Sequence, residues 1–165
     1  MSRIRLAALV VAMALGMGLL TSCTVPEGAV TGVGVAADGA PMVFVAVCKG
    51  RIDAAVLHEE GDATPEAHTH WQHAGAVKDF AAWPFAGNAE WSVDRSPLLS
   101  PGHAYTLYGA THDNTWSGVH VRFSFDDLAA LSVDQVRYSP WRDVNSVVTT
   151  SVAEFRAHAC DQRKK

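Results

Sequence analysis

The segment 101–125 constrains the fold more than any other part of the chain. Apolar and polar side chains alternate through residues 103–109 and again through 118–125, with a short polar loop between the two runs. The side chains that share one face are Tyr105, Leu107, Val119, Val121, Phe123 and Phe125. Alternation with a period of two is typical of a strand that has one face on a core. The segment therefore predicts two antiparallel strands, and the rest of the chain must supply the strands that pack against them.

Residues 1–22 have the order of parts that an export signal has. Arg3 and Arg5 precede an apolar run over residues 6–20, which is shorter than the ~20 apolar residues that a membrane-spanning helix needs. Small residues end the run. We therefore expect a signal peptide at 1–22.

The next residue suggests a lipid anchor. Leu20-Thr21-Ser22-Cys23 resembles the bacterial lipobox, which implies cleavage before Cys23 and attachment of lipid to the cysteine sulfur. Acyl chains on one cysteine hold a protein at a membrane without a spanning helix. We expect a lipidated tether at 23–28 and a location on the extracytoplasmic face of the cell membrane, with the membrane as a partner through the anchor. The alternative is an ordinary signal peptide that happens to be cut near Cys23.

The net charge of the exported chain argues against two kinds of partner. Removing residues 1–22 takes away two of the 13 Lys and Arg side chains and none of the 17 Asp and Glu side chains. The exported chain is then acidic, which argues against binding to nucleic acid and against electrostatic binding of the chain to anionic lipid. Residues 29–161 are enough for one domain with its own core, and a basic tail follows at 162–165.

The remaining cysteines predict a disulfide bond. Once Cys23 is assigned to lipid, Cys48 and Cys160 form an even pair in an exported protein. A bridge over so long a loop is worth roughly 4–5 kcal/mol in the chain-entropy model. Two separately buried thiols are the alternative.

The first part of the domain predicts strands at 30–36, 42–48 and 52–58, which we interpret as a meander. Residues 42–48 are apolar on both faces, which indicates a strand covered on both sides. Residues 59–75 carry acidic residues, histidines and a proline without an apolar period, and are predicted to form an exposed loop.

Weaker strand patterns follow at 77–83, 89–94 and 136–139. Ser151, with Glu154 three residues later, predicts the start of a helix that ends at Cys160. About seven short strands without long helices between them predict an all-β fold.

Residues 99–105 resemble the E–F corner of immunoglobulin-like sandwiches. The resemblance implies an antiparallel immunoglobulin-like β-sandwich, here with a short C-terminal helix, in which the Tyr105 hydroxyl bonds back across the corner. A core aromatic without that bond is the alternative. The mature chain also resembles small actinobacterial lipoproteins of unassigned function, through Gly32-Val33-Gly34, the strand ending at Cys48, this corner and the helix ending at Cys160. That resemblance implies an architecture and no activity.

Histidines cluster in the segment 58–73. His68, His70 and His73 in a flexible loop are spaced to reach one Zn²⁺ or Cu²⁺, with Glu66 or His58 as a further ligand. A divalent-metal-binding lipoprotein is therefore the alternative function. The competing interpretation is a polar loop with solvated histidines, and on that interpretation no cofactor is bound.

The loop 111–116 between the two strands of the opening segment is the second candidate site. His112, Asp113 and Trp116 have the chemistry to hold a sugar or a peptide, since an indole stacks and polar groups orient a ligand. The alternative is that Asp113 shapes the turn while Trp116 packs on the end of the sandwich.

The chain has no nucleophile elbow and no glycine-rich phosphate loop after a strand. We therefore expect a non-enzymatic binding or structural module of the cell envelope, with an envelope protein, peptide or glycan as its partner.

Overall fold

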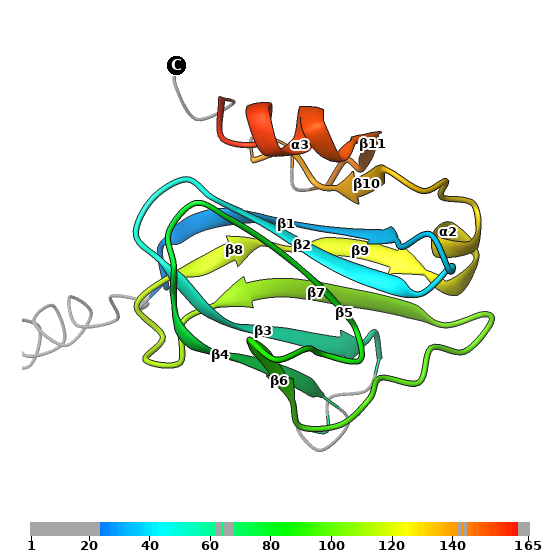
Figure 1. Ribbon diagram of the computed structural model, residues 1–165, viewed down its shortest axis with the longest axis horizontal. Coiled ribbons are helices and arrows are strands. Elements are labelled where there is room, and N and C mark those ends of the chain that lie inside the picture. The colour runs from blue at the N-terminus through cyan, green and yellow to red at the C-terminus, as the bar shows by residue number, and fades with distance from the viewer. Residues whose placement is uncertain (1–23, 62–63, 65–67, 142, 144, 162–165) are drawn as a thin grey trace, which may run out of the picture.

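The computed structural model describes residues 24–61, 64, 68–141, 143 and 145–161 (Figure 1). Two short helices, α2 (Phe125–Ala129) and α3 (Val152–His158), accompany a much larger set of strands. The strands are β1 (Glu27–Val35), β2 (Pro41–Val47), β3 (Ile52–Glu59), β4 (Thr69–Val77), β5 (Phe80–Pro84), β6 (Trp91–Val93), β7 (Ala104–Ala110), β8 (Ser117–Val119), β9 (Val121–Ser124), β10 (Gln135–Tyr138) and β11 (Val148–Ser151). The predicted all-β sandwich with a short C-terminal helix is confirmed.

The strands form two layers that share β1 (Figure 1). One layer has the order β5-β2-β1-β10-β11, and the other has the order β6-β4-β3-β7, with β8 and β9 on the far edge of β7. The first residues of β1 pair in parallel with β8, while residues 32–34 pair with β10. Because β1 makes hydrogen bonds in both layers, it nearly closes the sandwich along one side.

The predicted strand pair at 101–125 is confirmed, with one break. β9 pairs with the first part of β7, β8 pairs with its end, and His120 lies between β8 and β9. Phe125 does not continue the strand as predicted. The Ser124 hydroxyl accepts a hydrogen bond from the Asp127 N–H and so begins α2, which leaves Phe125 39% exposed.

The main core lies between the two layers and is rich in tryptophan. The rings of Trp83 and Trp91 stack with centroids 3.6 Å apart. Trp71 is fully buried, and its indole N–H donates to the Phe85 carbonyl oxygen at 3.0 Å. A buried indole needs such an acceptor, and this bond fixes where β4 sits relative to the segment after β5.

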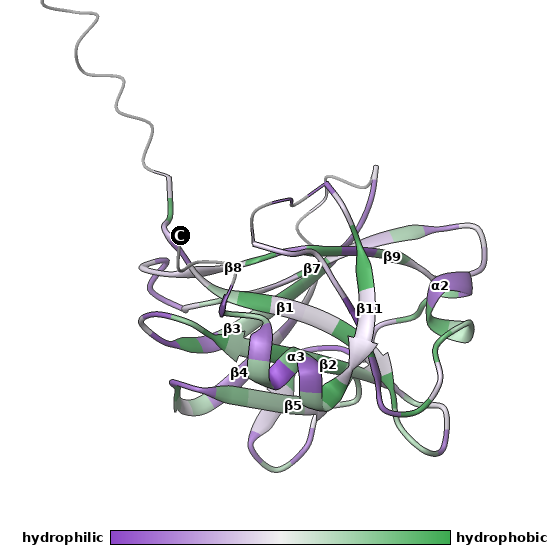
Figure 2. Cartoon of the chain, turned by 90° about the horizontal axis from the view of Figure 1, so that it is seen from above, coloured by the Kyte–Doolittle hydropathy of each residue, from purple (hydrophilic) through white to green (hydrophobic). Residues whose placement is uncertain are grey.

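A second core covers the outer face of the β2 layer. Phe155 of α3 is fully buried there, edge-on to Tyr138 of β10, and Phe44 of β2 belongs to the same cluster. Figure 2 shows α3 above this layer. Val43 and Val45 of β2 face the main core, so β2 is covered on both faces, as its apolar sequence predicts.

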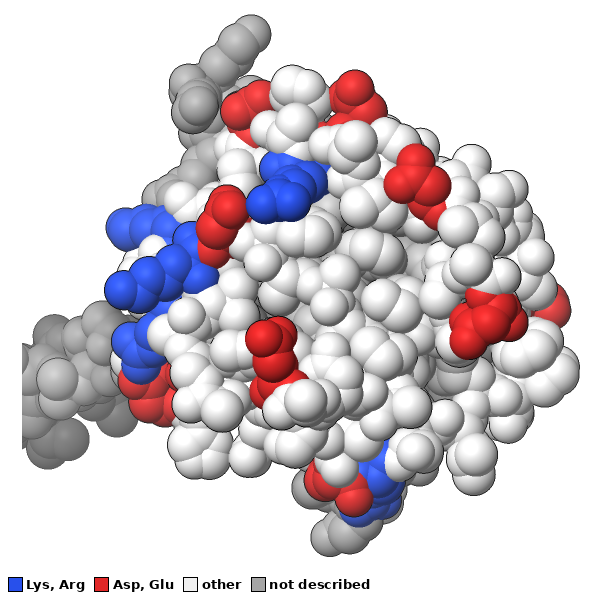
Figure 3. All heavy atoms as spheres, in the orientation of Figure 1, with Lys and Arg blue, Asp and Glu red and all other residues white. Residues whose placement is uncertain are grey.

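Charge is distributed unevenly over the molecule. On the face seen in Figure 3, most Lys and Arg side chains gather toward the end where β1 begins. The opposite end, which carries α2, shows only Asp and Glu on that face. On this face the two ends of the sandwich therefore differ in the sign of their charged side chains.

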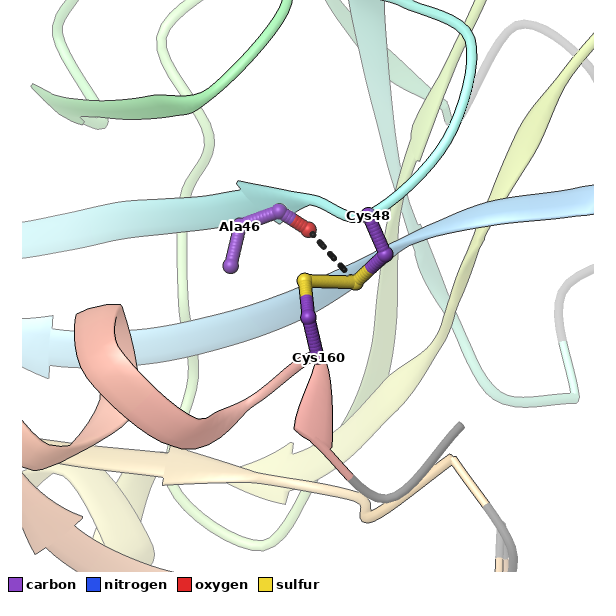
Figure 4. The surroundings of a disulfide bond; sticks show 3 residues. All are labelled: Ala46, Cys48 and Cys160. Atoms are coloured by element: carbon purple, nitrogen blue, oxygen red, sulfur yellow. Dashed lines mark hydrogen bonds between the residues drawn. A yellow bond between two sulfur atoms is a disulfide. The ribbon is translucent and has the colours of Figure 1, made fainter. Parts of the chain in front are cut away.

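Cys48 and Cys160 form a disulfide bond, with Cα atoms 5.3 Å apart (Figure 4). Cys48 directly follows β2, and Cys160 lies just after α3. The bond ties the helix that covers the second core to the strand beneath it, as the cysteine count predicts.

The predicted tyrosine corner is also present. The Tyr105 ring is buried in the main core, and its hydroxyl oxygen accepts a hydrogen bond from the Ser100 N–H at 2.8 Å. The bond fixes the approach of the chain into β7.

Three predictions about the strands are wrong. The first three strands are not a meander: β2 pairs with β1 and β5, so both of its edges are occupied and β3 crosses to the other layer. The segment 59–75 is not a loop throughout, because β4 begins at Thr69. Imidazole and amide side chains at residues 70, 72 and 73 leave no clear apolar alternation in that strand. The described residues contain eleven strands rather than about seven, since short pieces such as β11 carry little apolar signal.

Replacing Tyr105 by Phe tests the corner. The Tyr105→Phe variant keeps the buried ring but leaves the Ser100 N–H without its acceptor, so we expect the free energy of unfolding to fall by about 1 kcal/mol in urea denaturation. Tyr138→Phe is the matched control, since Tyr138 is held by packing against Phe155. Equal losses in the two variants would show that the back-bond contributes nothing special.

Candidate functional site

The two outer faces of the sandwich differ in cover. The β2 layer is covered by α3, whereas in the described part of the chain no element packs over the outer face of β3, β4, β7 and β9. On this open face Val56 lies directly between His70 of β4 and Tyr108 of β7. In the same way His58 lies beside Thr106. Within the described residues, the side chains of this face are therefore not covered by a helix.

Imidazole and phenol rings gather on this open face. The ring centroids of His58 and His68 are 5.3 Å apart, and the Tyr108 ring stands edge-on to His58 at 6.3 Å. His70 lies 6.1 Å from His68. We call this group, His58, His68, His70, Thr106 and Tyr108, the histidine face.

A shallow open hollow of about 500 Å³ lies over the histidine face. Its lining combines rings, carboxylates and a hydroxyl, namely His58, Glu59, Glu60, Gly61, His68, Thr106 and Tyr108. A hollow of this composition offers ring faces for stacking and oxygen atoms that accept hydrogen bonds. These are the groups that orient a polar ligand.

Glu60 anchors the polar side of the hollow. Its two carboxylate oxygens accept hydrogen bonds from the Arg122 guanidinium, and Thr106 Oγ1 donates to Oε1 at 3.1 Å. The bonds from Arg122 are the main reason that the pKa of Glu60 lies below its usual value. Glu60 therefore keeps a negative charge and a fixed position beside the rings.

His58 is held in its neutral form. Burial is the largest cause that lowers the pKa of His58, and the neighbouring His68 lowers it further. The charge of Glu60 acts in the opposite direction, and His120 adds a smaller lowering effect. Burial likewise raises the pKa of Tyr108. Near neutral pH the centre of the hollow is thus an uncharged imidazole beside an uncharged phenol.

The predicted set His68, His70 and His73 does not converge. Residues 70 and 73 lie on opposite faces of β4, and the His73 ring packs against Trp91 at 4.9 Å. Its Nδ1 also lies 3.1 Å from the Gly75 nitrogen. Among the residues that the structure describes, no three His, Cys, Asp or Glu side chains are arranged to hold a metal ion. Glu66 lies outside the described residues.

The sequence analysis missed Tyr108, Thr106 and Glu60 as members of a site. The signal was present, because residues 106 and 108 occupy the polar positions in the alternation of 103–109. What was lacking was the register: only the pairing of β3 with both β4 and β7 brings these positions beside His58 and His70.

The loop 111–116 is organised by its own hydrogen bonds. Thr111 Oγ1 accepts from the N–H groups of Thr115 and Trp116 at 2.9 and 3.0 Å. Asp113 accepts from the Thr115 hydroxyl at 2.6 Å and pairs with Arg51 at 2.5 Å. The bonds from Thr115 are the main reason that the pKa of Asp113 lies well below its usual range. The polar groups of Asp113 are therefore largely engaged within the protein.

His112 and Trp116 of this loop lie in different surroundings. His112 lines a second hollow of about 360 Å³ with Asp53, Gln72 and His73. The backbone N–H of His112 donates to Asp53 Oδ1 at 2.7 Å. Trp116 does not line that hollow. It packs on the end of the sandwich, so the three predicted ligand residues do not share one cavity.

A comparison with protein-family models, curated proteins and solved structures finds no match for this chain. Within the described residues, no helix has the length and apolar character to cross a membrane. Cys23, the predicted lipidation site, lies outside the described residues.

The titration of His58 tests the electrostatics of the histidine face. We expect His58 to titrate below 6.5 in a pH series of NMR spectra. Glu60→Gln removes a negative charge and is expected to lower the pKa of His58 further, while His68→Gln removes a positive charge and is expected to raise it. His112→Gln, in the other hollow, is the control without effect. A rise of the pKa in Glu60→Gln would contradict this electrostatic picture.

Proposed function

We propose that this protein is a lipid-anchored module on the extracytoplasmic face of the cell membrane, which binds a glycan of the cell envelope without catalysing a reaction. The observation that carries the binding proposal is the asymmetry of the sandwich. The chain covers one outer face with its own helix, whereas no described element covers the other face, where rings gather over a hollow.

The chemistry of the hollow favours a polyhydroxylated ligand. The rings of Tyr108, His58 and His68 offer faces that pack on the C–H side of a sugar ring, and their phenol and imidazole polar atoms offer hydrogen bonds to sugar hydroxyl groups. The hollow is open rather than enclosed, which suits a polymer that lies across the surface.

A binding role is also consistent with how Glu60 is held. Arg122 and Thr106 engage the Glu60 carboxylate. Such a carboxylate is fixed in position and charge, which suits orientation of a ligand better than transfer of a proton.

The anchor is supported by the sequence alone, through the signal at 1–22 and the lipobox-like Leu20-Thr21-Ser22-Cys23. We expect the full chain, expressed in a bacterium that processes lipoproteins, to partition into the detergent phase. Mass spectrometry should then find diacylglycerol on the N-terminal Cys23. Cys23→Ala is expected to lose both properties. A wild-type chain that is exported without any acyl mass would refute the anchor.

Binding is tested with purified bacterial envelope polysaccharides, muropeptides and unrelated peptides, added to the detergent-solubilised full chain. We expect polysaccharide to shift the NMR signals of His58 and Tyr108, and His58→Ala to weaken binding at least tenfold. His112→Ala is the matched control, since it removes a histidine from the other hollow.

Two results would redirect the proposal. Loss of binding in His112→Ala with full binding in His58→Ala would move the site to the loop 111–116. Saturable binding of unrelated peptides in place of polysaccharide would keep the site and replace the ligand class.

A further inference from the structure

The start of the domain is fixed to the sandwich almost as far as the predicted anchor. The Pro26 carbonyl oxygen accepts from the Ser117 N–H at 3.0 Å, and the Gly28 carbonyl oxygen accepts from the N–H groups of Cys48 and Lys49 at 2.8 Å. Only residues 24 and 25 separate Pro26 from Cys23. Because an extended chain advances at most about 3.5 Å per residue, Cys23 lies within roughly 10 Å of Pro26.

An indole ring lies close to the start of the domain. Trp116 immediately precedes Ser117, and its ring lies against the backbone of Gly28 and Gly50. A Cβ atom at these glycines would come within 2.8 and 2.4 Å of the ring, so only glycine admits it. The ring is partly exposed, and the Lys49 ammonium lies 5.1 Å from its centroid. A rigid Trp–Lys pair thus flanks the point where the chain leaves the domain.

A second lysine lies at the same end. Lys78 is in the turn between β4 and β5, and that turn is held beside the end of β2 because the Val47 N–H donates to the Asp79 carbonyl oxygen at 2.6 Å. Figure 3 shows most Lys and Arg side chains toward this end of the molecule. Arg51 pairs with Asp113 at 2.5 Å, and Arg156 lies 3.9 Å from the Asp79 carboxylate, whereas Lys49 and Lys78 are exposed cations at this end.

We infer that this end, made by Trp116, Lys49 and Lys78, is seated on the bilayer surface, with the Trp116 ring at the level of the lipid headgroups. The inference rests on the acyl anchor of the proposed function, which brings Trp116 to the membrane. Tryptophan and lysine are the residues that the membrane–water interface favours, the first for its amphipathic ring and the second because its stem reaches the headgroups. The interaction surface is thus a lipid surface, contacted in addition to the acyl chains.

Contact of this end with the bilayer determines the direction in which the histidine face points. β3 begins at Ile52 near the seated end and reaches His58 six residues later, which at about 3.3 Å per residue is roughly 20 Å farther along the strand. The hollow over His58 therefore faces away from the bilayer, whereas the loop 111–116 lies beside the bilayer. This arrangement favours the histidine face over the loop as the site for a large envelope polymer.

Fluorescence quenching by brominated lipid tests the seat. The full acylated chain is reconstituted in vesicles of phosphatidylcholine and phosphatidylglycerol (3:1) with bromine atoms near the headgroup end of the acyl chains. Three of the five tryptophans, Trp71, Trp83 and Trp91, are buried in the main core. We expect quenching in the wild-type protein, and Trp116→Phe to remove more than half of it. Trp141→Phe, which also removes a partly buried indole, is the matched control and should retain it.

The outcomes distinguish contact of Trp116 with the bilayer from attachment of the protein by its acyl chains. An acylated, vesicle-bound protein that shows no quenching, or the same quenching in Trp116→Phe, overturns the seat and leaves the anchor standing. A wild-type protein that is not acylated refutes the proposed function instead. Near-UV circular dichroism of each variant verifies the fold, and Cys23→Ala is expected to show no quenching with the same vesicles.

Discussion

The backbone pairing of β1 is the interaction on which the rest of the structure depends. β1 pairs with β2 along one edge and divides its other edge between β8 and β10. A strand that serves both layers leaves little freedom for the angle between them. It also places β10 and β11 in the same layer as β2, and α3, which follows β11, packs over the outer face of that layer. The covered face and the open face of the sandwich both follow from this single strand.

Sequence reasoning reached the parts of the fold whose signals are local. The alternation around Leu107 and Val121, the cap at Ser151 and the corner at Tyr105 each depend on a few neighbouring residues, and each is present. The sequence predicts that β3 pairs with β2, because the two strands are adjacent in sequence. In the structure that edge of β2 pairs with β5, which the sequence does not reveal. The sequence predicts a loop around Trp71, because a single large apolar residue among histidines shows no apolar periodicity.

The candidate site was less accessible to prediction than the fold. The sequence groups His68, His70 and His73, with Glu66 or His58 as a further ligand. In the structure His58 lies beside His68, and His70 lies beside His68 as well, but His73 packs against Trp91 instead. The two-residue repeat of a strand sends His73 to the other face. Tyr108 joins them only through β7, forty residues away in sequence. No spacing rule connects such positions without the register of both strand pairs.

The disulfide bond has a topological consequence for the whole molecule. Cys160 is bonded to Cys48, whose backbone N–H is held by Gly28, so the first and last described segments leave the sandwich at the same pole. The opposite pole carries the corner at Pro101-Gly102 and helix α2. A reporter attached behind α3 therefore begins beside the entry of the chain, whereas an insertion at the corner projects from the far side.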